Sequence, residues 1–329
     1  MKLSIVILCW NDLALIQECL RSIHAGTHRT EFEVVVSDNG STDGSVRFIH
    51  ENYPSVRVIE NHANLGFARG NNLGITASQG QYILILNPDT VIHDGSLDRL
   101  VAFADRHQKA GAFGCRVLNR DGSYQISARP FPTVWRYWIA GLHLRSLGRL
   151  SRLFIADIYP GWKGDSERKV DWQSGCCVMF RSDLLKRLGG FDEQFFYHFE
   201  EVDLCLRVWQ AGLSILFTPE ASITHLGGQS VGRSPIRFEL EKLRNRYRYF
   251  YKHFGPRGSR SCRQATQAWL RVRQIGYGLL GLVRPSDSLR NRLEMYRVVV
   301  PWNMVVDPVR LVEKGEEPTV ERQPVVRPS

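Results

Sequence analysis

The sequence contains no uninterrupted run of eighteen or more apolar residues, so we expect no membrane-spanning helix. The apolar run at residues 5–8 is too short for the core of a signal peptide and continues directly into polar residues, so we expect none there. The 7 cysteines are scattered, odd in number and without Cys-x-x-Cys spacing, which favours small buried hydrophobes in a reducing compartment. Together these absences predict a cytoplasmic protein.

Two common nucleotide-binding motifs are also missing. A dinucleotide-binding oxidoreductase would show Gly-x-Gly-x-x-Gly after its first strand, but the turn Cys9-Trp10-Asn11-Asp12 has no glycine. No Gly-x-x-x-x-Gly-Lys-Ser/Thr loop occurs either, which argues against a P-loop ATPase. Acidic residues are outnumbered, 33 against 43 basic residues, and this excess indicates an anionic partner, either a phosphate-bearing substrate or an acidic membrane face. No recognised nucleic-acid-binding motif accompanies the charge, so we expect no nucleic acid partner.

The stretch that organises the rest of the chain is Leu84-Ile85-Leu86-Asn87-Pro88-Asp89. An apolar run bounded by a turn signal predicts a buried strand, and Pro88 must end it because proline cannot continue a hydrogen-bonded ladder. Asp89 is therefore expected at the carboxyl end of a central strand, the edge at which open α/β sheets bind ligands. A carboxylate there suits a hard divalent cation, which often brings substrate phosphates with it.

Strand-like runs alternate with helical periodicity through the first 110 residues. Strands are predicted at residues 2–8, 33–37, 56–59 and 82–86, and helices at 13–23, 46–52 and 73–78. This order predicts an α/β fold with a mostly parallel sheet and helices on both faces. Asp38, like Asp89, follows a strand directly. The glycines and asparagines of residues 61–72 allow close backbone approach to a ligand, and Arg69 among them can pair with phosphate.

The second half is less regular. Strands are predicted at residues 114–118, 170–181 and 215–217, and helices at 96–109, 182–188 and from residue 200 onward. That last helix starts with Glu200, Glu201 and Asp203, which also favour the helix dipole, so a purely structural interpretation exists. Residues 130–169 are aromatic and basic. They are either a mobile lid or acceptor- or lipid-contacting surface, or ordinary helices whose aromatics pack on the sheet.

The C-terminal region from residue 233 changes in character. Residues 239–254, 269–283 and 289–300 show helical patterns rich in basic and aromatic side chains, with apolar portions too short to span a membrane. A basic amphipathic helix with interleaved aromatics favours association with an anionic membrane surface. The alternatives are a helical bundle packed on the catalytic domain or a homodimer interface. Residues 313–329, rich in proline, glutamate and valine, are predicted to be disordered.

Six short motifs, in this order and spacing, resemble the inverting family 2 glycosyltransferases of the GT-A fold, especially their bacterial rhamnosyltransferase-like branch. The motifs are Ser4-Ile5-Val6-Ile7, Ser37-Asp38-Asn39-Gly40-Ser41-Thr42-Asp43, Asn64-Leu65-Gly66-Phe67-Ala68, Leu86-Asn87-Pro88-Asp89, Gly189-Gly190-Phe191-Asp192-Glu193 and Glu200-Glu201-Val202-Asp203-Leu204. The resemblance implies a GT-A catalytic domain over residues 1–232. Its nucleotide-sugar half would span 1–110 and its acceptor half 111–232. A helical, membrane-associating extension over 233–312 would follow.

The resemblance also implies donor-site and metal-site roles. Asp38 would contact the nucleoside. The remaining nucleotide-sugar-binding candidates are Asn64, Gly66, Arg69, Asn72 and Asn87. Asp89 occupies the last position of the family's Asp-x-Asp-type motif and would bind Mg²⁺ or Mn²⁺. Asn87 at the first position leaves one charged ligand, which predicts weak metal binding without nucleotide. His225 matches a position where many relatives have a metal-ligating histidine.

For catalysis, the resemblance implies a base from the acidic pair: Glu201 stands in the usual base position, with Glu200 as the fallback. Trp172, Asp192 and Asp203 would shape the acceptor and sugar pocket. The implied function is an inverting transfer of a sugar, L-rhamnose from dTDP-rhamnose above others, to a glycan or polyprenyl-diphosphate-linked acceptor at the inner face of the cell membrane. The alternatives are a UDP-hexose or UDP-N-acetylhexosamine transferase on the same fold and a non-enzymatic protein that binds anionic ligands.

Overall fold

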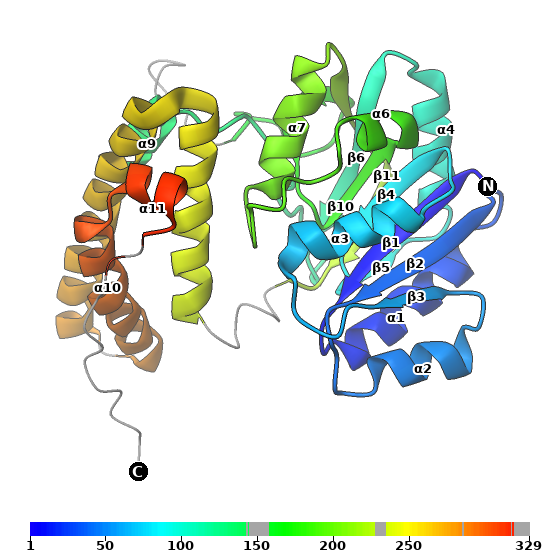
Figure 1. Cartoon of the computed structure of the whole chain (residues 1–329), viewed down its shortest axis with the longest axis horizontal. Helices are drawn as coiled ribbons and strands as arrows, with labels where there is room; N and C mark the ends of the chain where they lie inside the picture. Colours follow the sequence, from blue (N-terminus) through cyan, green and yellow to red (C-terminus); the bar gives the residue numbers. More distant parts are fainter. Residues whose placement is uncertain (143, 145–157, 228–234, 285, 317, 319–329) are drawn as a thin grey trace. The chain divides into compact units, whose positions relative to one another are not determined.

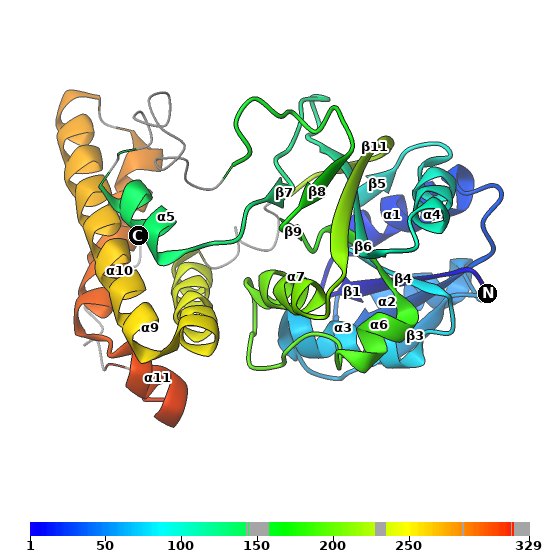
Figure 2. The same ribbon diagram turned by 90° about the horizontal axis from the view of Figure 1, so that it is seen from above.

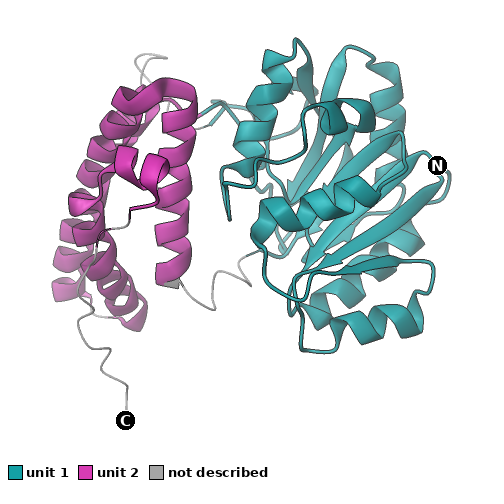
Figure 3. Ribbon diagram, in the orientation of Figure 1, with its two compact units in different colours: residues 1–131, 157–230 teal, residues 132–156, 231–329 magenta. Residues whose placement is uncertain are grey.

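The computed structural model describes the whole chain except residues 143, 145–157, 228–234, 285, 317 and 319–329 (Figure 1). The chain divides into two compact units (Figure 3). The first comprises residues 1–131 and 157–230, and the second comprises residues 132–156 and 231–329. The predicted disordered tail falls mostly outside the described residues, although its first two residues end the helix Pro308–Lys314.

The first unit is built on one mixed, mostly parallel sheet with the strand order β3-β2-β1-β4-β10-β6-β11-β5, to which β8 adds by pairing with β11. The parallel strands of the first half are β1 (Leu3–Cys9), β2 (Phe32–Asp38), β3 (Arg57–Glu60) and β4 (Tyr82–Leu86). The second half adds β5 (Thr90–Ile92), β6 (Ala110–Leu118), β8 (Arg168–Val170), β10 (Cys177–Arg181) and β11 (Ser214–His225). The four predicted N-terminal strands are thus confirmed to within a residue or two at each end.

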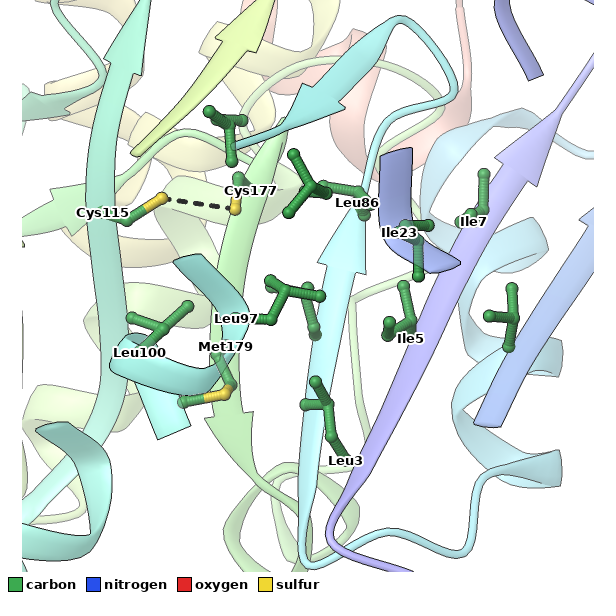
Figure 4. Close-up of a cluster of buried hydrophobic side chains, with 14 of the residues drawn as sticks. Leu3, Ile5, Ile7, Ile23, Leu86, Leu97, Leu100, Cys115, Cys177 and Met179 are labelled. Carbon is green, nitrogen blue, oxygen red and sulfur yellow. Dashed lines mark hydrogen bonds between the residues drawn. The ribbon is translucent and has the colours of Figure 1, made fainter. Parts of the chain in front are cut away.

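Helices cover both faces of this sheet. They are α1 (Leu13–Gly26), α2 (Ser45–Asn52), α3 (Gly66–Ala77), α4 (Ser96–Arg106), α6 (Ser182–Arg187) and α7 (Glu200–Gln210). One buried cluster joins α1 and α4 to the sheet, and a second joins α3, α6 and α7 to the opposite face. In the first cluster the Sγ atoms of Cys115 and Cys177 lie 3.5 Å apart on neighbouring strands (Figure 4). All seven cysteines are free and buried.

Several predicted boundaries are wrong. Helix α3 begins at Gly66 rather than near residue 73, and strands β6 and β11 are longer than the predicted 114–118 and 215–217. Residues 170–181 do not form one strand. They contain the last residue of β8, the whole of β9 (Trp172–Gln173) and the whole of β10. A turn separates β9 from β10, where the Cys177 N–H donates to the Ser174 carbonyl over 3.3 Å. The short β9 is not part of the large sheet and instead pairs with β7 (Ala128–Arg129) in a separate two-stranded sheet.

Strand register brings several chain ends to one edge of the sheet. Cys9 is opposite Asp38 between β1 and β2, and Ile7 is opposite Leu86 between β1 and β4, so these parallel strands end at nearly the same level. The antiparallel β10 begins at this edge, because Cys177 is opposite Leu86. The carboxyl ends of β2 and β4 and the turn before β10 therefore form one polar edge.

The second unit is helical: α5 (Val134–Gly141), α9 (Pro235–Val283), α10 (Asp287–Val305) and α11 (Pro308–Lys314). Helices α5, α10 and α11 all pack against α9 (Figure 2). The label α9 covers two helical segments that meet at Gly255, whose backbone is non-helical with φ +69° and which precedes Pro256; the predicted helices 239–254 and 269–283 lie on either side of it. The aromatics of α5 contact α9, where Tyr137 and Phe250 make an edge-on pair. In the described part of the chain, no helix is both long and apolar enough to cross a bilayer.

Candidate functional site

Asp38 ends β2, and its two carboxylate oxygens differ in their surroundings. Oδ2 accepts hydrogen bonds from the backbone N–H groups of Gly40, at 3.0 Å, and Ser41, at 2.8 Å. Oδ1 is buried and has no hydrogen-bond partner among the described residues. A buried carboxylate oxygen without a donor costs free energy unless a ligand supplies one. Asp38 therefore fixes the turn with one oxygen and offers the other to a bound group.

Asn39, which the sequence analysis did not single out, joins this turn to the start of α3. Its Nδ2 donates to Asn64 Oδ1 over 3.3 Å and to the Gly66 carbonyl over 3.2 Å, and its Oδ1 accepts from Asn61 Nδ2 over 2.9 Å. Asn64 and Gly66 are thereby held beside the end of β2. The sequence feature that could have identified Asn39 is its position directly after Asp38, the aspartate that ends a predicted strand.

Gly66 lies where α3 meets the loop that leads into α7. Its φ is +81°, and a Cβ atom there would lie 2.6 Å from the Phe196 ring and 2.7 Å from the Phe196 carbonyl. The Phe67 N–H donates to that same carbonyl over 2.8 Å. Glycine is required here because a side chain would push away the loop that carries the acidic pair.

Asn72 and Arg69 connect α3 to the turn that follows α6. The Asn72 amide accepts from the Phe191 N–H over 2.8 Å and donates to the Phe191 carbonyl over 2.9 Å, so both ends of the side chain bind backbone. Arg69 is largely exposed, with Nε 3.9 Å from Glu193 Oε2. Asn72 therefore holds α3 to the backbone at Phe191, whereas Arg69 lies at the surface.

Asp89 and His225 face each other beyond the end of β4. Antiparallel pairing of β5 with β11 places Thr90 opposite His225, and the Leu226 N–H donates to the Asp89 carbonyl over 2.9 Å. His225 Nε2 lies 3.2 Å from Asp89 Oδ1, yet this buried oxygen accepts no aligned hydrogen bond from the described residues. Both side chains are mostly buried, at 16% and 13% exposure.

A chain of hydrogen bonds fixes the orientation of the His225 ring. Asn119 Nδ2 donates to Ser123 Oγ over 2.9 Å, so its Oδ1 can accept from Gln125 Nε2 over 2.8 Å. Gln125 Oε1 then faces His225 Nδ1 at 2.7 Å and must accept from it. The proton of a neutral His225 is thus held on Nδ1, and the lone pair of Nε2 is directed towards Asp89.

The acidic pair begins α7 after an unusual backbone turn. His198 and Phe199 both have positive φ, at 66° and 76°, which costs about 1–3 kcal/mol for each non-glycine residue. Glu200 and Glu201 are nonetheless buried, at 4% and 8% exposure, and the Oε2 atom of each lacks a hydrogen-bond partner among the described residues. Such strain and unpaired buried carboxylates concentrate at functional sites.

Burial raises the pKa of both carboxyl groups. The pKa of Glu201 rises to about 7, because desolvation outweighs the backbone hydrogen bonds that favour its charged form. The pKa of Glu200 rises further, well above its ordinary value, since desolvation is joined by the charge of Glu201. Burial therefore favours the protonated form of both carboxyls, and the charge of Glu201 adds to this preference at Glu200.

The half-buried Tyr197 and the buried Cys176 feel the charges of both the acidic pair and Asp89. Burial raises the pKa of the Tyr197 phenol to about 12, and the charges of Glu200, Glu201 and Asp89 add to this rise. The pKa of the Cys176 thiol also rises to about 12 through burial, with contributions from Asp89 and Glu201. The Cys176 carbonyl accepts from the Asn87 N–H over 3.0 Å, which attaches the turn before β10 to the end of β4.

The three predicted pocket residues make structural contacts. Asp203 is fully buried, and its Oδ2 accepts from Arg207 Nε over 2.8 Å. Asp192 Oδ1 accepts from the Gln194 N–H over 3.0 Å. The half-buried Trp172 donates from Nε1 to the Pro130 carbonyl over 3.0 Å. These contacts support the backbone around the edge of the sheet.

Comparisons with known proteins show which family the chain belongs to. The family described as "Glycosyl transferase family 2" matches residues 4–189, more than half of the chain. The "N-acetylglucosaminyl-diphospho-decaprenol L-rhamnosyltransferase" of Mycobacterium tuberculosis is 32% identical over 257 residues, which cover 71% of this chain and 78% of that protein. "Rhamnosyltransferase WbbL" of Escherichia coli K12 is 25% identical over 223 residues, covering 64% of this chain and 78% of that protein.

A solved structure extends the agreement to the fold. The mannosyltransferase PcManGT from Pyrobaculum calidifontis, in complex with GDP-Man and Mn²⁺, superposes with a TM-score of 0.56 at 17% identity, covering 96% of this chain and 88% of that chain. This likeness confirms the predicted GT-A fold with its C-terminal helices. The chain belongs to glycosyltransferase family 2, and rhamnosyltransferases are among its relatives.

Proposed function

We propose that this protein is an inverting transferase that moves L-rhamnose from dTDP-rhamnose to a hydroxyl of a glycan or polyprenyl-diphosphate-linked glycan in cell-surface polysaccharide synthesis. The observation that carries the proposal is the polar edge of the sheet, where Asp38 ends β2, Asp89 follows β4 on the other side of β1, and Gly175 in the turn before β10 lies next to Glu201. The names of both rhamnosyltransferase relatives support a rhamnosyl donor, and the name of the Mycobacterium tuberculosis relative supports a lipid-linked acceptor. A UDP-hexose or UDP-N-acetylhexosamine donor is the alternative.

Asp89 and His225 fit a divalent cation. The unpaired Asp89 Oδ1 and the Nε2 lone pair of His225 are 3.2 Å apart. Neighbouring ligands around an octahedral Mg²⁺ are separated by about 3 Å, given bonds of about 2.0–2.1 Å. The described residues contain no group of three or more His, Cys, Asp or Glu side chains able to hold a metal, so diphosphate and water oxygens would complete the shell. Mg²⁺ or Mn²⁺ would then bind weakly without nucleotide.

The chain's own residues would act as follows. Asp38 binds the nucleoside through its unpaired Oδ1, with Asn64 and Gly66 shaping that side of the pocket. Glu201 removes the proton from the acceptor hydroxyl while the hydroxyl oxygen attacks the anomeric carbon of the sugar. The bond between that carbon and the nucleoside diphosphate breaks on the opposite side. The bound cation supplies Lewis-acid stabilisation of the departing diphosphate. Arg69, exposed near this edge, adds a positive charge to the same leaving group.

Activity should depend on the ionisation of Glu201. The base must be deprotonated to accept a proton, and its pKa is raised to about 7. We therefore expect kcat/KM to rise about tenfold per pH unit below neutrality and to level off above pH 7. The measurement is a pH profile at saturating metal. A flat profile between pH 5.5 and 8 would argue against Glu201 as the base.

Gln125 should raise the metal affinity of the site through His225, without contacting substrate. Replacing it with alanine frees the Nδ1 side of the His225 ring, and loss of such a supporting contact typically weakens metal affinity about 10–100-fold. Gln125→Glu keeps an acceptor oxygen and is the matched control. Mn²⁺ binding, followed by electron paramagnetic resonance with dTDP present, is the readout. Equal Mn²⁺ affinity in Gln125→Ala and the unmodified protein would contradict ligation by His225.

The proposed function is tested by a donor screen. Hydrolysis and thermal shift are measured across dTDP-, UDP- and GDP-sugars, with Mn²⁺ and with chelator. Metal-dependent turnover of dTDP-rhamnose supports the proposal, and turnover of a UDP-sugar instead supports the alternative. Nucleotide binding without turnover of any donor, with acceptors supplied, would indicate a non-enzymatic ligand-binding protein.

A further inference from the structure

The C-terminal end of α9 carries an exposed apolar stripe. It consists of Val272, Ile275, Leu279, Leu282 and Val283, which are 45%, 63%, 61%, 83% and 77% exposed. Their spacing of three and four residues places them on one side of the helix. Isolated exposed apolar residues are common on protein surfaces, but a continuous stripe of this kind indicates an interaction surface.

The opposite side of the same helix is already occupied by α10. The Tyr277 and Tyr296 rings lie 5.8 Å apart, the Arg292 side chain donates to the Tyr277 hydroxyl over 3.2 Å, and a Cβ on Gly281 would contact Leu293. At 100° per residue, Tyr277 and Gly281 project away from the stripe. The stripe is therefore not the face that holds the helical hairpin together.

The surroundings of the stripe are strongly basic. Between residues 268 and 298 the sequence has six arginines and only two acidic residues. Five of the six arginines are exposed, at positions 271, 284, 290, 292 and 297. Arg271 directly precedes the stripe and Arg284 directly follows it. The sixth, Arg273, lies over the Trp269 ring at 4.5 Å.

We propose that the α9–α10 hairpin docks on an anionic phospholipid surface, with the stripe inserted at the level of the headgroups. Basic charge flanking an exposed apolar stripe complements an acidic bilayer, and the helix lies on the membrane because it is not apolar enough to cross it. A second copy of this chain is a poorer partner for the stripe. A symmetric dimer would bring the same patch from both copies together, and their arginines would repel each other.

The test is co-sedimentation of the full chain with vesicles, using the double variant Ile275→Glu/Leu279→Glu. The unmodified protein should sediment with phosphatidylglycerol-containing vesicles and much less with pure phosphatidylcholine. The affinity of the double variant for these vesicles should be lower by roughly tenfold or more, since two inserted apolar side chains become charged. Ile236→Glu adds the same charge near the other end of α9, at an exposed position outside the stripe, and should bind like the unmodified protein.

Two further measurements separate this proposal from its alternatives. Turnover on a short water-soluble acceptor should be unchanged in the double variant, so loss of vesicle binding is distinguished from failure of the proposed transferase activity. Light scattering gives the oligomeric state. Equal vesicle binding by the double variant and the unmodified protein would overturn the proposal. A dimer that the double variant dissociates, without vesicle binding by either form, would overturn it in favour of self-association.

Discussion

Replacing Glu201 with glutamine should lower turnover by about 10²–10⁴-fold and leave nucleotide binding nearly intact. The amide keeps the shape of the side chain but cannot accept the acceptor proton. Asp38, Asn64 and Asp89, which we assign to donor and metal binding, are untouched by the change. Turnover is measured with saturating donor, and nucleotide affinity by calorimetry. A loss of nucleotide affinity as large as the loss of turnover would contradict the role of Glu201 as base.

Glu200→Gln is the matched control. The pKa of Glu200 is raised well above its ordinary value, so glutamine resembles the protonated form already present near neutrality. We expect a small change in turnover and little change in the pH profile, because Glu200 is already uncharged over the range in which Glu201 titrates. If Glu200→Gln were the more damaging of the two variants, Glu200 would be the base.

Glu201→Gln should also change the thermal stability of the protein. Since the pKa of this buried carboxyl is raised to about 7, the folded state holds its proton more tightly than the unfolded chain does. The stabilisation is therefore present at low pH and lost as pH rises through about 7. Glu201→Gln should unfold at a temperature equal to or higher than that of the unmodified protein at pH 8. Thermal unfolding at pH 8 thus also shows that an inactive variant is folded.

Asp89→Ala should abolish metal-dependent turnover, a loss of about 10³-fold or more given the several kcal/mol that a bound cation typically contributes. The reason is that Asp89 supplies the single charged ligand of the proposed site and faces His225 at 3.2 Å. Turnover is compared at increasing Mn²⁺ concentrations. Asp94→Ala, a few residues along the chain, removes a carboxylate that is 86% exposed and paired with His28, and should have little effect.

Full activity in Asp89→Ala would refute the metal role of this carboxylate. Restoration of activity by very high Mn²⁺ would instead place the defect in affinity, as expected if diphosphate oxygens supply most of the remaining ligands. Asp89→Asn refines the result, because the amide keeps the size and one oxygen but removes the charge. An intermediate loss in Asp89→Asn would show that charge as well as geometry holds the cation.

Local sequence patterns predicted the elements that carry the site. The runs ending at Asp38 and Asp89 are short, apolar and followed by turn residues, so their strands could be located without the structure. The acidic pair at the start of α7 was equally visible. These features are readable because strand burial and helix periodicity depend on neighbours in the sequence.

The supporting contacts could not be predicted, because they join residues far apart in the chain. Gln125 meets His225 across 100 positions, and Asn72 meets Phe191 across 119. The left-handed turn at His198 and Phe199 was missed because a bulky aromatic residue such as Phe199 rarely adopts a positive φ. Helix α3 began earlier than predicted because Gly66 and Asn64 start it through a side-chain contact that sequence periodicity does not report.

The central claim is that a cation held by Asp89 and His225 anchors a nucleoside diphosphate beside Glu201. The most direct measurement is a Mn²⁺ titration, followed by electron paramagnetic resonance, with and without dTDP or UDP. The account predicts weak Mn²⁺ binding alone, binding at least about tenfold tighter with nucleotide, loss of this coupling in Asp89→Ala and its retention in Glu201→Gln. Nucleotide affinity that is the same with Mn²⁺ and with chelator, or coupling that survives in Asp89→Ala, would contradict it.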